Sequence, residues 1–442
     1  MSTNKSNKPE LRFKGFSDDW EQRKAVDIAD YSKGNGYSKS DLTENGTPII
    51  LYGKLYTKYQ FAIDEVETFA TPIDGSIYSQ GNEVIIPASG ETAEDIARAS
   101  AVEKSGILLG GDLNILRPFN FINPLFLALT ISNGEPQKEL AKKAQGKSVV
   151  HIHNSDIQEV TVSFPTRAEQ DRIVAVFRSL DHLITLHQRK CDNLKIIKKS
   201  MLDNLFPKNG KKVPKWRFKG FNDDWEQRKL GKLGKARSGI GFPDAEQGGK
   251  EGVPFYKVSD MNNVGNEHEM VVANNHVTRE QIARKGWKPI DEVPAIFFAK
   301  VGAAVLLNRK RLCRFPFLLD NNTMAYSIDG SALDADFAIT LFDTIDLTSL
   351  VQIGALPSYN SGDVENIDVV IPEMSEQRKI GAYFKRIDNL ITLHQRKIKY
   401  ILKEVFIWII LIKRVVLKKP LLLSYRIMVG RKRLLSILQN RI

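Results

Sequence analysis

The chain has few cysteines and no long apolar run. Only Cys191 and Cys313 occur among its 442 residues, which excludes a disulfide framework and favours a cytoplasmic protein. The polar start MSTNKSNKPE lacks the apolar segment of a secretory signal, and no apolar run is long enough to span a bilayer. We therefore expect no membrane partner.

Acidic residues are missing from one end of the chain. Residues 405–442 contain nine Lys or Arg and no Asp or Glu, so most of the net charge of +12 lies there. The rest of the chain is close to neutral. Any basic surface on the body of the protein must therefore come from local clustering of Lys and Arg.

Complete catalytic motifs are also missing. The Gly146–Ser148 segment resembles the end of a P-loop, but Ala141 stands where the loop needs its first glycine. Residues 123–126 resemble a methyltransferase NPPF motif with one proline missing, and we interpret them as a turn into a core helix. His151 and His153 have no partners that would complete a metal site. The sequence predicts a non-catalytic chain without a metal or cofactor of its own.

What the sequence does have is a repeat. LRFKGFSDDWEQRK (11–24) returns as WRFKGFNDDWEQRK (216–229), identical at 12 of 14 positions. EQDRIVAVFRSLDHLITLHQRK (169–190) returns as EQRKIGAYFKRIDNLITLHQRK (376–397), identical at 14 of 22 positions. The stretches between these blocks have similar lengths but little similarity. The chain therefore holds two different domains in equivalent positions.

The second block of each repeat has the spacing of a heptad. Apolar residues recur at alternating intervals of three and four after Pro165 and after Pro372, which predicts two long helices that pack as a coiled coil. The predicted seam residues are Ile173, Phe177, Leu180, Ile184, His187, Ile380, Phe384, Ile387, Ile391 and His394. We interpret His187 and His394 as polar seam residues that fix the register; a metal site or a pH switch is the alternative.

These blocks divide the chain into six parts. We predict a first globular domain over 1–164, a helix over 165–206, a linker over 207–213, a second globular domain over 214–372, a helix over 373–406 and a basic, apolar tail over 407–442. The domains have strand-like stretches, such as 47–56 and 293–301, broken by turns and short helices. The expected fold class is α+β, with two mixed α/β domains and a pseudo-twofold internal repeat.

The duplicated blocks and their order resemble the specificity subunit of type I restriction-modification systems. The resemblance covers residues 9–404 and rests on RFKGFxDDWEQRK, EQxxI and DxLITLHQRK in each half. SGETAEDIA (89–97), GGDLNILRP (110–118) and LPSYNSGDVENI (356–367) also look like that family.

The resemblance implies a DNA-reading scaffold. Each globular domain would be a target-recognition domain that reads one half of a bipartite site in double-stranded DNA. The two long helices would pack antiparallel as a spacer. They would dock two modification (methyltransferase) subunits, which are joined by two restriction (translocase and nuclease) subunits. S-adenosylmethionine, ATP and Mg²⁺ would be bound by those partners, and this chain would carry no cofactor.

Lysines, tyrosines and small polar residues in loops are candidates for DNA contact, because such side chains bind phosphates or base edges. In the first domain they are Lys33, Asn35, Tyr37, Lys39, Lys54, Tyr56, Ser89, Thr92, Lys147 and Ser148. In the second they are Lys257, Ser259, Lys300, Asn308, Arg309, Lys310, Arg311, Ser358, Tyr359 and Asn360. Lys54 and Tyr56 lie two positions apart in the strand-like stretch 47–56, so we expect them to share one face of a strand. The run Asn308–Arg311 is the strongest expected phosphate clamp.

The two copies of the helix diverge after Lys190 and Lys397. Our hypothesis for the apolar, basic end is a frameshifted or recombined coding sequence; phase-variable shuffling and a membrane anchor are the alternatives. The copy would then be a defective or phase-varied specificity subunit with impaired assembly. Outside this family, a stand-alone DNA-modifying enzyme and a purely structural coiled-coil adaptor remain as alternatives.

Overall fold

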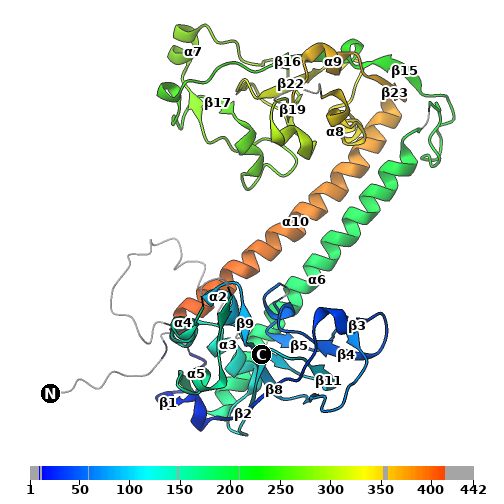
Figure 1. Ribbon diagram of the computed structural model, residues 1–442. Coiled ribbons are helices and arrows are strands. Elements are labelled where there is room, and N and C mark those ends of the chain that lie inside the picture. Colours follow the sequence, from blue (N-terminus) through cyan, green and yellow to red (C-terminus); the bar gives the residue numbers. More distant parts are fainter. Residues whose placement is uncertain are drawn as a thin grey trace. The chain divides into compact units, whose positions relative to one another are not determined.

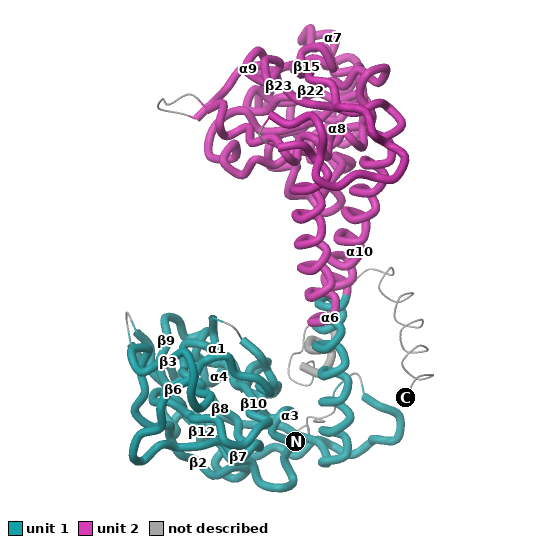
Figure 2. The backbone as a smooth tube through the Cα atoms, turned by 90° about the vertical axis from the view of Figure 1, so that its right-hand side faces the viewer, with its two compact units in different colours: residues 1–183, 401–442 teal, residues 184–400 magenta. Residues whose placement is uncertain are grey.

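The computed structural model describes residues 9, 12–57, 59–146, 149–208, 210–351 and 357–413, with side chains up to residue 405. The chain forms two compact units, coloured separately in Figure 2. Unit 1 takes in residues 1–183 and 401–442, and unit 2 takes in residues 184–400. Each unit therefore contains one globular domain and parts of both long helices. Most of the predicted tail lies outside the described residues, and so do Lys147 and Ser148.

Unit 1 begins with an α/β domain. Its strands are β1 (Glu21–Lys24), β2 (Ala29–Lys33), β3 (Leu42–Thr43), β4 (Thr47–Ile50), β5 (Ala62–Ile63), β6 (Phe69–Ala70), β7 (Tyr78–Gln80), β8 (Glu83–Pro87), β9 (Ser89–Gly90), β10 (Ser100–Val102), β11 (Ser105–Leu109), β12 (Leu113–Pro118), β13 (Val150–His151) and β14 (Thr161–Phe164). Its short helices are α1 (Lys54–Thr57), α2 (Ala93–Ile96), α3 (Pro124–Ile131), α4 (Gly134–Lys143) and α5 (Asn154–Gln158).

Two five-stranded sheets organise this domain, in the orders β2-β12-β8-β10-β5 and β3-β6-β4-β11-β7. The central strand β8, EVIIP, is buried along its whole length. An apolar run of this kind suits a strand that is covered on both faces. Asn123 caps α3 by accepting hydrogen bonds from Leu125 N and Phe126 N at 2.9 and 3.2 Å. The interpretation of residues 123–126 as a turn into a core helix is therefore confirmed.

Unit 2 contains a second α/β domain. Its strands are β15 (Glu226–Lys229), β16 (Gly234–Ser238), β17 (Val253–Tyr256), β18 (His276–Val277), β19 (Ala295–Ala299), β20 (Lys310–Cys313), β21 (Leu318–Leu319), β22 (Thr323–Ile328) and β23 (Asp368–Ile371). Its helices are α7 (Arg279–Lys285), α8 (Ala335–Thr344) and α9 (Ser361–Glu365). Figure 1 labels the three helices and the strands β15, β16, β17, β19, β22 and β23.

The two domains share a core topology despite their dissimilar sequences. In unit 1, β12 pairs antiparallel with β2 and β8, and in unit 2, β22 pairs antiparallel with β16 and β19. The parallel pair β4–β11 has its counterpart in β17–β21. β19, AIFFA, is as fully buried as β8. The repeat therefore extends through the dissimilar stretches at the level of the fold.

The two long helices are α6 (Arg167–Leu205) and α10 (Met374–Lys413). Within unit 2 they run side by side in both views (Figures 1 and 2). His187 contacts His394, Cys191 Sγ lies 3.7 Å from Ile391 O, and the Phe206 ring packs on Phe384. Since the numbers rise on one helix as they fall on the other, the helices are antiparallel here.

The structure divides the predicted seam residues between helix packing and domain cores. Ile173 and Phe177 are buried in the core of unit 1, and Ile380 and Phe384 in that of unit 2. Leu180, Ile184, His187 and His394 are half-buried, while Ile387 and Ile391 are buried. The first two positions of each copy therefore belong to a domain core, and Phe384 also packs on Phe206 just past the end of α6. The heptad spacing predicts that one face of the helix is buried, but it does not predict which element packs against that face.

Candidate nucleic-acid interface

The repeated DDWEQRK segment joins the repeated helix segment in space. β1 pairs antiparallel with β14, the strand before α6, from Glu21↔Phe164 to Lys24↔Thr161. β15 pairs in the same way with β23, the strand before α10, from Glu226↔Ile371 to Lys229↔Asp368. Trp20 and Trp225 are buried at the start of these strands. The two repeated segments of each half therefore meet at the point where a domain joins its helix.

An arginine and a glutamate close each junction. Arg12 donates through Nε and Nη2 to the two carboxylate oxygens of Glu169, at 2.8 Å each. Arg217 donates in the same way to Glu376, at 2.8 and 2.7 Å. These hydrogen bonds raise the pKa of both arginines. The carboxylates lie in the first turns of α6 and α10, where the helix dipole also favours negative charge.

A glutamine completes the junction in both copies. The amide oxygen of Gln170 accepts from Asn123 N at 2.8 Å, and that of Gln377 accepts from Asp334 N at 2.9 Å. Their amide groups donate to Pro165 O and Pro372 O, at 2.9 Å each. We call the set Arg12, Trp20–Lys24, Glu169 and Gln170, with its copy Arg217, Trp225–Lys229, Glu376 and Gln377, the mount. Sequence reasoning found its blocks but assigned these residues no role; the identity of the repeats is the signal that marks them.

Some candidates for DNA contact in unit 1 are solvent-exposed. Lys33, Lys39, Lys54 and Thr92 are exposed, and Asn35 and Tyr56 are half-buried. Tyr37 and Ser89 are buried, and Tyr37 Oη contacts Ser76 Oγ at 2.6 Å. The side chains of Tyr37 and Ser89 therefore face the protein, and a DNA contact of either residue stays a prediction. Lys54 and Tyr56 lie on helix α1 and not on the predicted strand, because β4 ends at Ile50.

Three separate segments meet beside Tyr56. β9 pairs with β13 through Ser89↔His151 and Val150↔Gly90, and residue 145 forms a bridge to His151. Burial is the largest cause of the raised pKa of Tyr56, and Tyr52, Glu91 after β9 and Asp95 on α2 raise this pKa further. The gathered loops of unit 1 therefore carry acidic as well as polar side chains.

The basic run of unit 2 is largely used inside the domain. Lys310 is buried and donates through Nζ to Ile345 O at 2.7 Å. Arg311 donates to Asn266 O at 2.7 Å, and Arg309 donates to Asn262 Oδ1 at 2.8 Å. Burial lowers the pKa of Lys310 to about 8. Lys310 and the two arginines are therefore bonded to groups of their own domain, and the phosphate clamp over Asn308–Arg311 stays a prediction.

Asn308 has a structural role in the same loop. It adopts a left-handed backbone with φ of 48°, and its side chain bonds Ile345 O and Leu347 N at 3.3 and 3.1 Å. A non-glycine residue in this region is held there by its surroundings. Asn308 therefore fixes the loop before β20 and has its polar atoms occupied.

The remaining candidates of unit 2 lie closer to solvent. Ser259 and Asn360 are exposed, while Lys257, Lys300 and Ser358 are half-buried. Tyr359 is buried and its hydroxyl donates to Ala299 O at 2.6 Å, so its side chain faces the protein and its DNA contact stays a prediction. A bridge between Val301 and Ser358 brings the loops after β19 and before α9 together, as β9 and β13 are in unit 1. Equivalent loops therefore meet in both domains.

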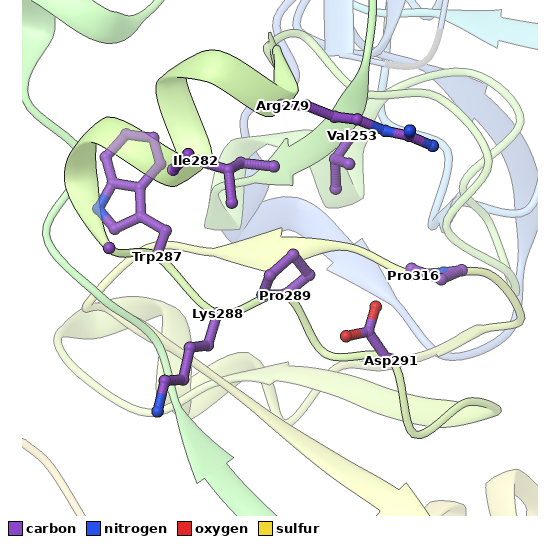
Figure 3. Close-up of a pocket in the computed structure, with 10 residues that line it drawn as sticks. Val253, Arg279, Ile282, Trp287, Lys288, Pro289, Asp291 and Pro316 are labelled. Carbon is purple, nitrogen blue, oxygen red and sulfur yellow. The ribbon is translucent and has the colours of Figure 1, made fainter.

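Unit 2 also has a surface hollow of about 600 Å³ between α7 and the loops that follow it (Figure 3). Its lining includes Trp287, Ile282 and Pro289, with the charged residues Arg279 and Lys288. In unit 1 the segment at this place, between β6 and β7, is a loop without a helix. The two domains therefore present different surfaces on the same framework.

The described residues contain no group of three or more His, Cys, Asp or Glu side chains placed to hold a metal ion. In the same residues, no helix has the length and apolar character needed to cross a membrane.

Comparisons with known proteins agree with the repeat. Residues 17–195 and 222–403 each match the family model of the type I restriction modification DNA specificity domain. The type I restriction enzyme MjaVIII specificity subunit of Methanocaldococcus jannaschii is 22% identical over 408 residues, covering 86% of this chain and 88% of that protein. The putative type I restriction enzyme MjaX specificity subunit of the same organism is 23% identical over 404 residues, covering 86% and 89%.

A solved structure has the same fold. The S subunit of a type I restriction-modification system from M. genitalium superposes with a TM-score of 0.63 at 14% identity, covering 93% of this chain and all of that one. With its two family matches spanning both domains and most of both long helices, the chain belongs to the type I restriction-modification DNA specificity family.

Proposed function

We propose that this chain reads an asymmetric, bipartite site in double-stranded DNA, with one domain for each half-site, and that it does so without catalysing a reaction. The observation that carries the proposal is the identical mount beneath two unlike surfaces. A duplicated framework matches the twofold symmetry of the duplex backbone, while unlike readers select unlike sequences.

The unlike surfaces can be located within the shared topology. In unit 1 the turn after β2 reads Gly34-Asn35-Gly36-Tyr37, and in unit 2 the turn after β16 reads Gly239-Ile240-Gly241-Phe242. These turns occupy the same place, because residue 35 bridges to Gly110 and residue 240 to Asp320. A polar side chain in one copy thus stands where an aliphatic one stands in the other, as two readers of different sequences require.

We further propose that the long helices bind the modification subunits, which would hold S-adenosylmethionine, and that restriction subunits with ATP and Mg²⁺ join the same complex. The support lies in exposed residues that did not diverge. Leu183, Leu186, Leu390 and Leu393 are exposed, yet each leucine is identical to its copy.

Neighbouring turns of the same helices supply a comparison. Asp171, Arg178 and Ser179 are exposed and have become Arg378, Lys385 and Arg386 in the second copy. Exposed positions could therefore change after the duplication. The segment 183–190 did not change, because its sequence is identical to that of 390–397. Folding does not require exposed leucines, so a shared partner surface accounts for their retention.

The test of the DNA-reading proposal is an exchange of residues 25–168 for the equivalent domain of another family member, with the mount left in place. In cells that carry the modification subunit, methylome sequencing should show that one half of the methylated sequence changes while the other half stays. This follows if each domain reads its half independently.

A matched control uses the repeated block before the domain. A Leu11→Trp/Ser17→Asn chain carries the second copy's sequence throughout residues 11–24, and its methylated sequence should equal that of the parent. A domain exchange that alters both halves, or neither, would contradict one reader per half-site.

A further inference from the structure

The two histidines of the repeat touch each other. His187 on α6 and His394 on α10 occupy the same position in the two copies, and their Nδ1 atoms lie 2.9 Å apart. Their ring centroids are 5.0 Å apart, with the planes inclined by 37°. Because each histidine is the other's copy, this contact is the point at which the duplicated helix segment meets itself.

The number of protons on the pair decides whether this contact is favourable. A bond between two Nδ1 atoms needs one N–H donor and one lone-pair acceptor. Two neutral imidazoles satisfy it, and so does a pair with one extra proton. With both rings charged, each Nδ1 carries a hydrogen, so two donors and two positive charges face each other.

The groups around the pair also oppose the second proton. Both rings are half-buried, and burial is the largest cause of the lowered pKa of His187 and of His394. The ammonium groups of Lys190 on α6 and Lys397 on α10 lower both pKa values further. The two helices thus place positive charge on the pair from both sides, and the two titrations are coupled.

We propose that His187 and His394 form an acid-sensitive joint between α6 and α10, which opens when both rings are protonated and then releases a modification subunit bound beside it. Leu186 and Leu393 are the next residues in sequence, so a movement of the joint reaches the proposed docking surface directly. The release step rests on the proposed function; the opening of the joint concerns this chain alone.

The direction of the pH effect follows from the lowered pKa values. A group whose folded pKa lies below its unfolded value of 6.5 favours the folded state while it is neutral. The contribution of the pair is therefore present above pH 6.5 and is lost as the pH falls through the unfolded pKa towards the folded one. The contact between α6 and α10 should be stable at pH 7.5 and less stable near pH 5.5.

The first measurement uses the full chain by itself. NMR titration of the imidazole carbons should show two separate steps for His187 and His394, both displaced below the ordinary midpoint. The control is His182→Asn, which removes an exposed histidine of the same helix and places there the residue of the second copy, Asn389. Two independent titrations at the ordinary midpoint would overturn the joint, whether or not any partner binds.

The second measurement is the affinity for the modification subunit at pH 7.5 and pH 5.5. The binding of the parent chain and of His182→Asn should weaken by about tenfold at pH 5.5, a usual size for the coupling between two linked sites. A His187→Gln/His394→Gln chain keeps a donor and an acceptor but cannot charge, so it should weaken less than about twofold. All three keep His268, whose Nδ1 lies 3.7 Å from Asp388 Oδ2, so any effect of this histidine is common to them.

Circular dichroism at pH 7.5 establishes that the double variant is folded. Equal weakening of the parent and the folded double variant overturns the joint. Absence of binding by the parent at both pH values contradicts the proposed docking instead, and the imidazole titration then decides on the joint alone.

Discussion

An Arg217→Met chain should lose about 3–5 kcal/mol of the stability of unit 2, the usual cost of removing one partner from a buried ion pair. The side chains of Arg217 and Glu376 are 13% and 1% exposed. Methionine fills a similar volume, but it leaves the Glu376 carboxylate buried without its two hydrogen bonds. Hydrogen exchange of the β15 and β23 amides in the full chain measures the loss locally.

The double variant separates the ion pair from the packing. In Arg217→Met/Glu376→Leu both charges are gone, so stability should return to within about 1–2 kcal/mol of the parent. The exposed pair Arg228–Glu226 is the control, because its side chains are 47% and 63% exposed. Arg228→Met should cost less than about 1 kcal/mol. Similar losses for Arg217→Met and Arg228→Met would show that the mount does not depend on its buried pair.

The repeat predicted the architecture because equivalent positions of the two halves can be compared within a single sequence. The identity of the two EQ pairs marked Glu169–Gln170 and Glu376–Gln377 as important, and the heptads predicted both long helices. Their function in the mount could not be predicted, because Arg12 and Glu169 lie 157 residues apart in the chain. Only the fold brings an arginine before the domain to a glutamate after it.

The surroundings of the DNA-contact candidates could not be predicted for a different physical reason. A run such as Asn308–Arg311 has the same composition whether it faces a phosphate or a carbonyl of its own protein. Here Lys310 meets Ile345 O, and Arg311 meets Asn266 O. Lys198 on α6 is a similar case. Although burial acts to lower its pKa, Asp343 and Asp388 raise it overall, and the lysine joins α6 to α8 and α10.

Charging the retained leucines should abolish assembly while leaving the fold intact. Anchor residues at protein interfaces contribute about 2 kcal/mol or more, so an aspartate at Leu390 and at Leu393 should weaken binding of one modification subunit by at least ~100-fold. Leu390 and Leu393 are 44% and 47% exposed. Their replacement should therefore change the stability of the chain itself by less than about 0.5 kcal/mol each.

The duplication turns this loss into a change of stoichiometry. With Leu390 and Leu393 charged, native mass spectrometry should find one modification subunit per chain in place of two, held by the first copy. Charging Leu183 and Leu186 as well should leave none. Leu402→Lys is the matched control, because Leu402 is 50% exposed on α10, outside the retained segment, and its first-copy counterpart is Lys195. If Leu402→Lys weakened assembly as much as the charged Leu390/Leu393 pair, exposed apolar area in general would explain the binding. A loss confined to the retained leucines would instead tie each partner subunit to one copy of the repeat.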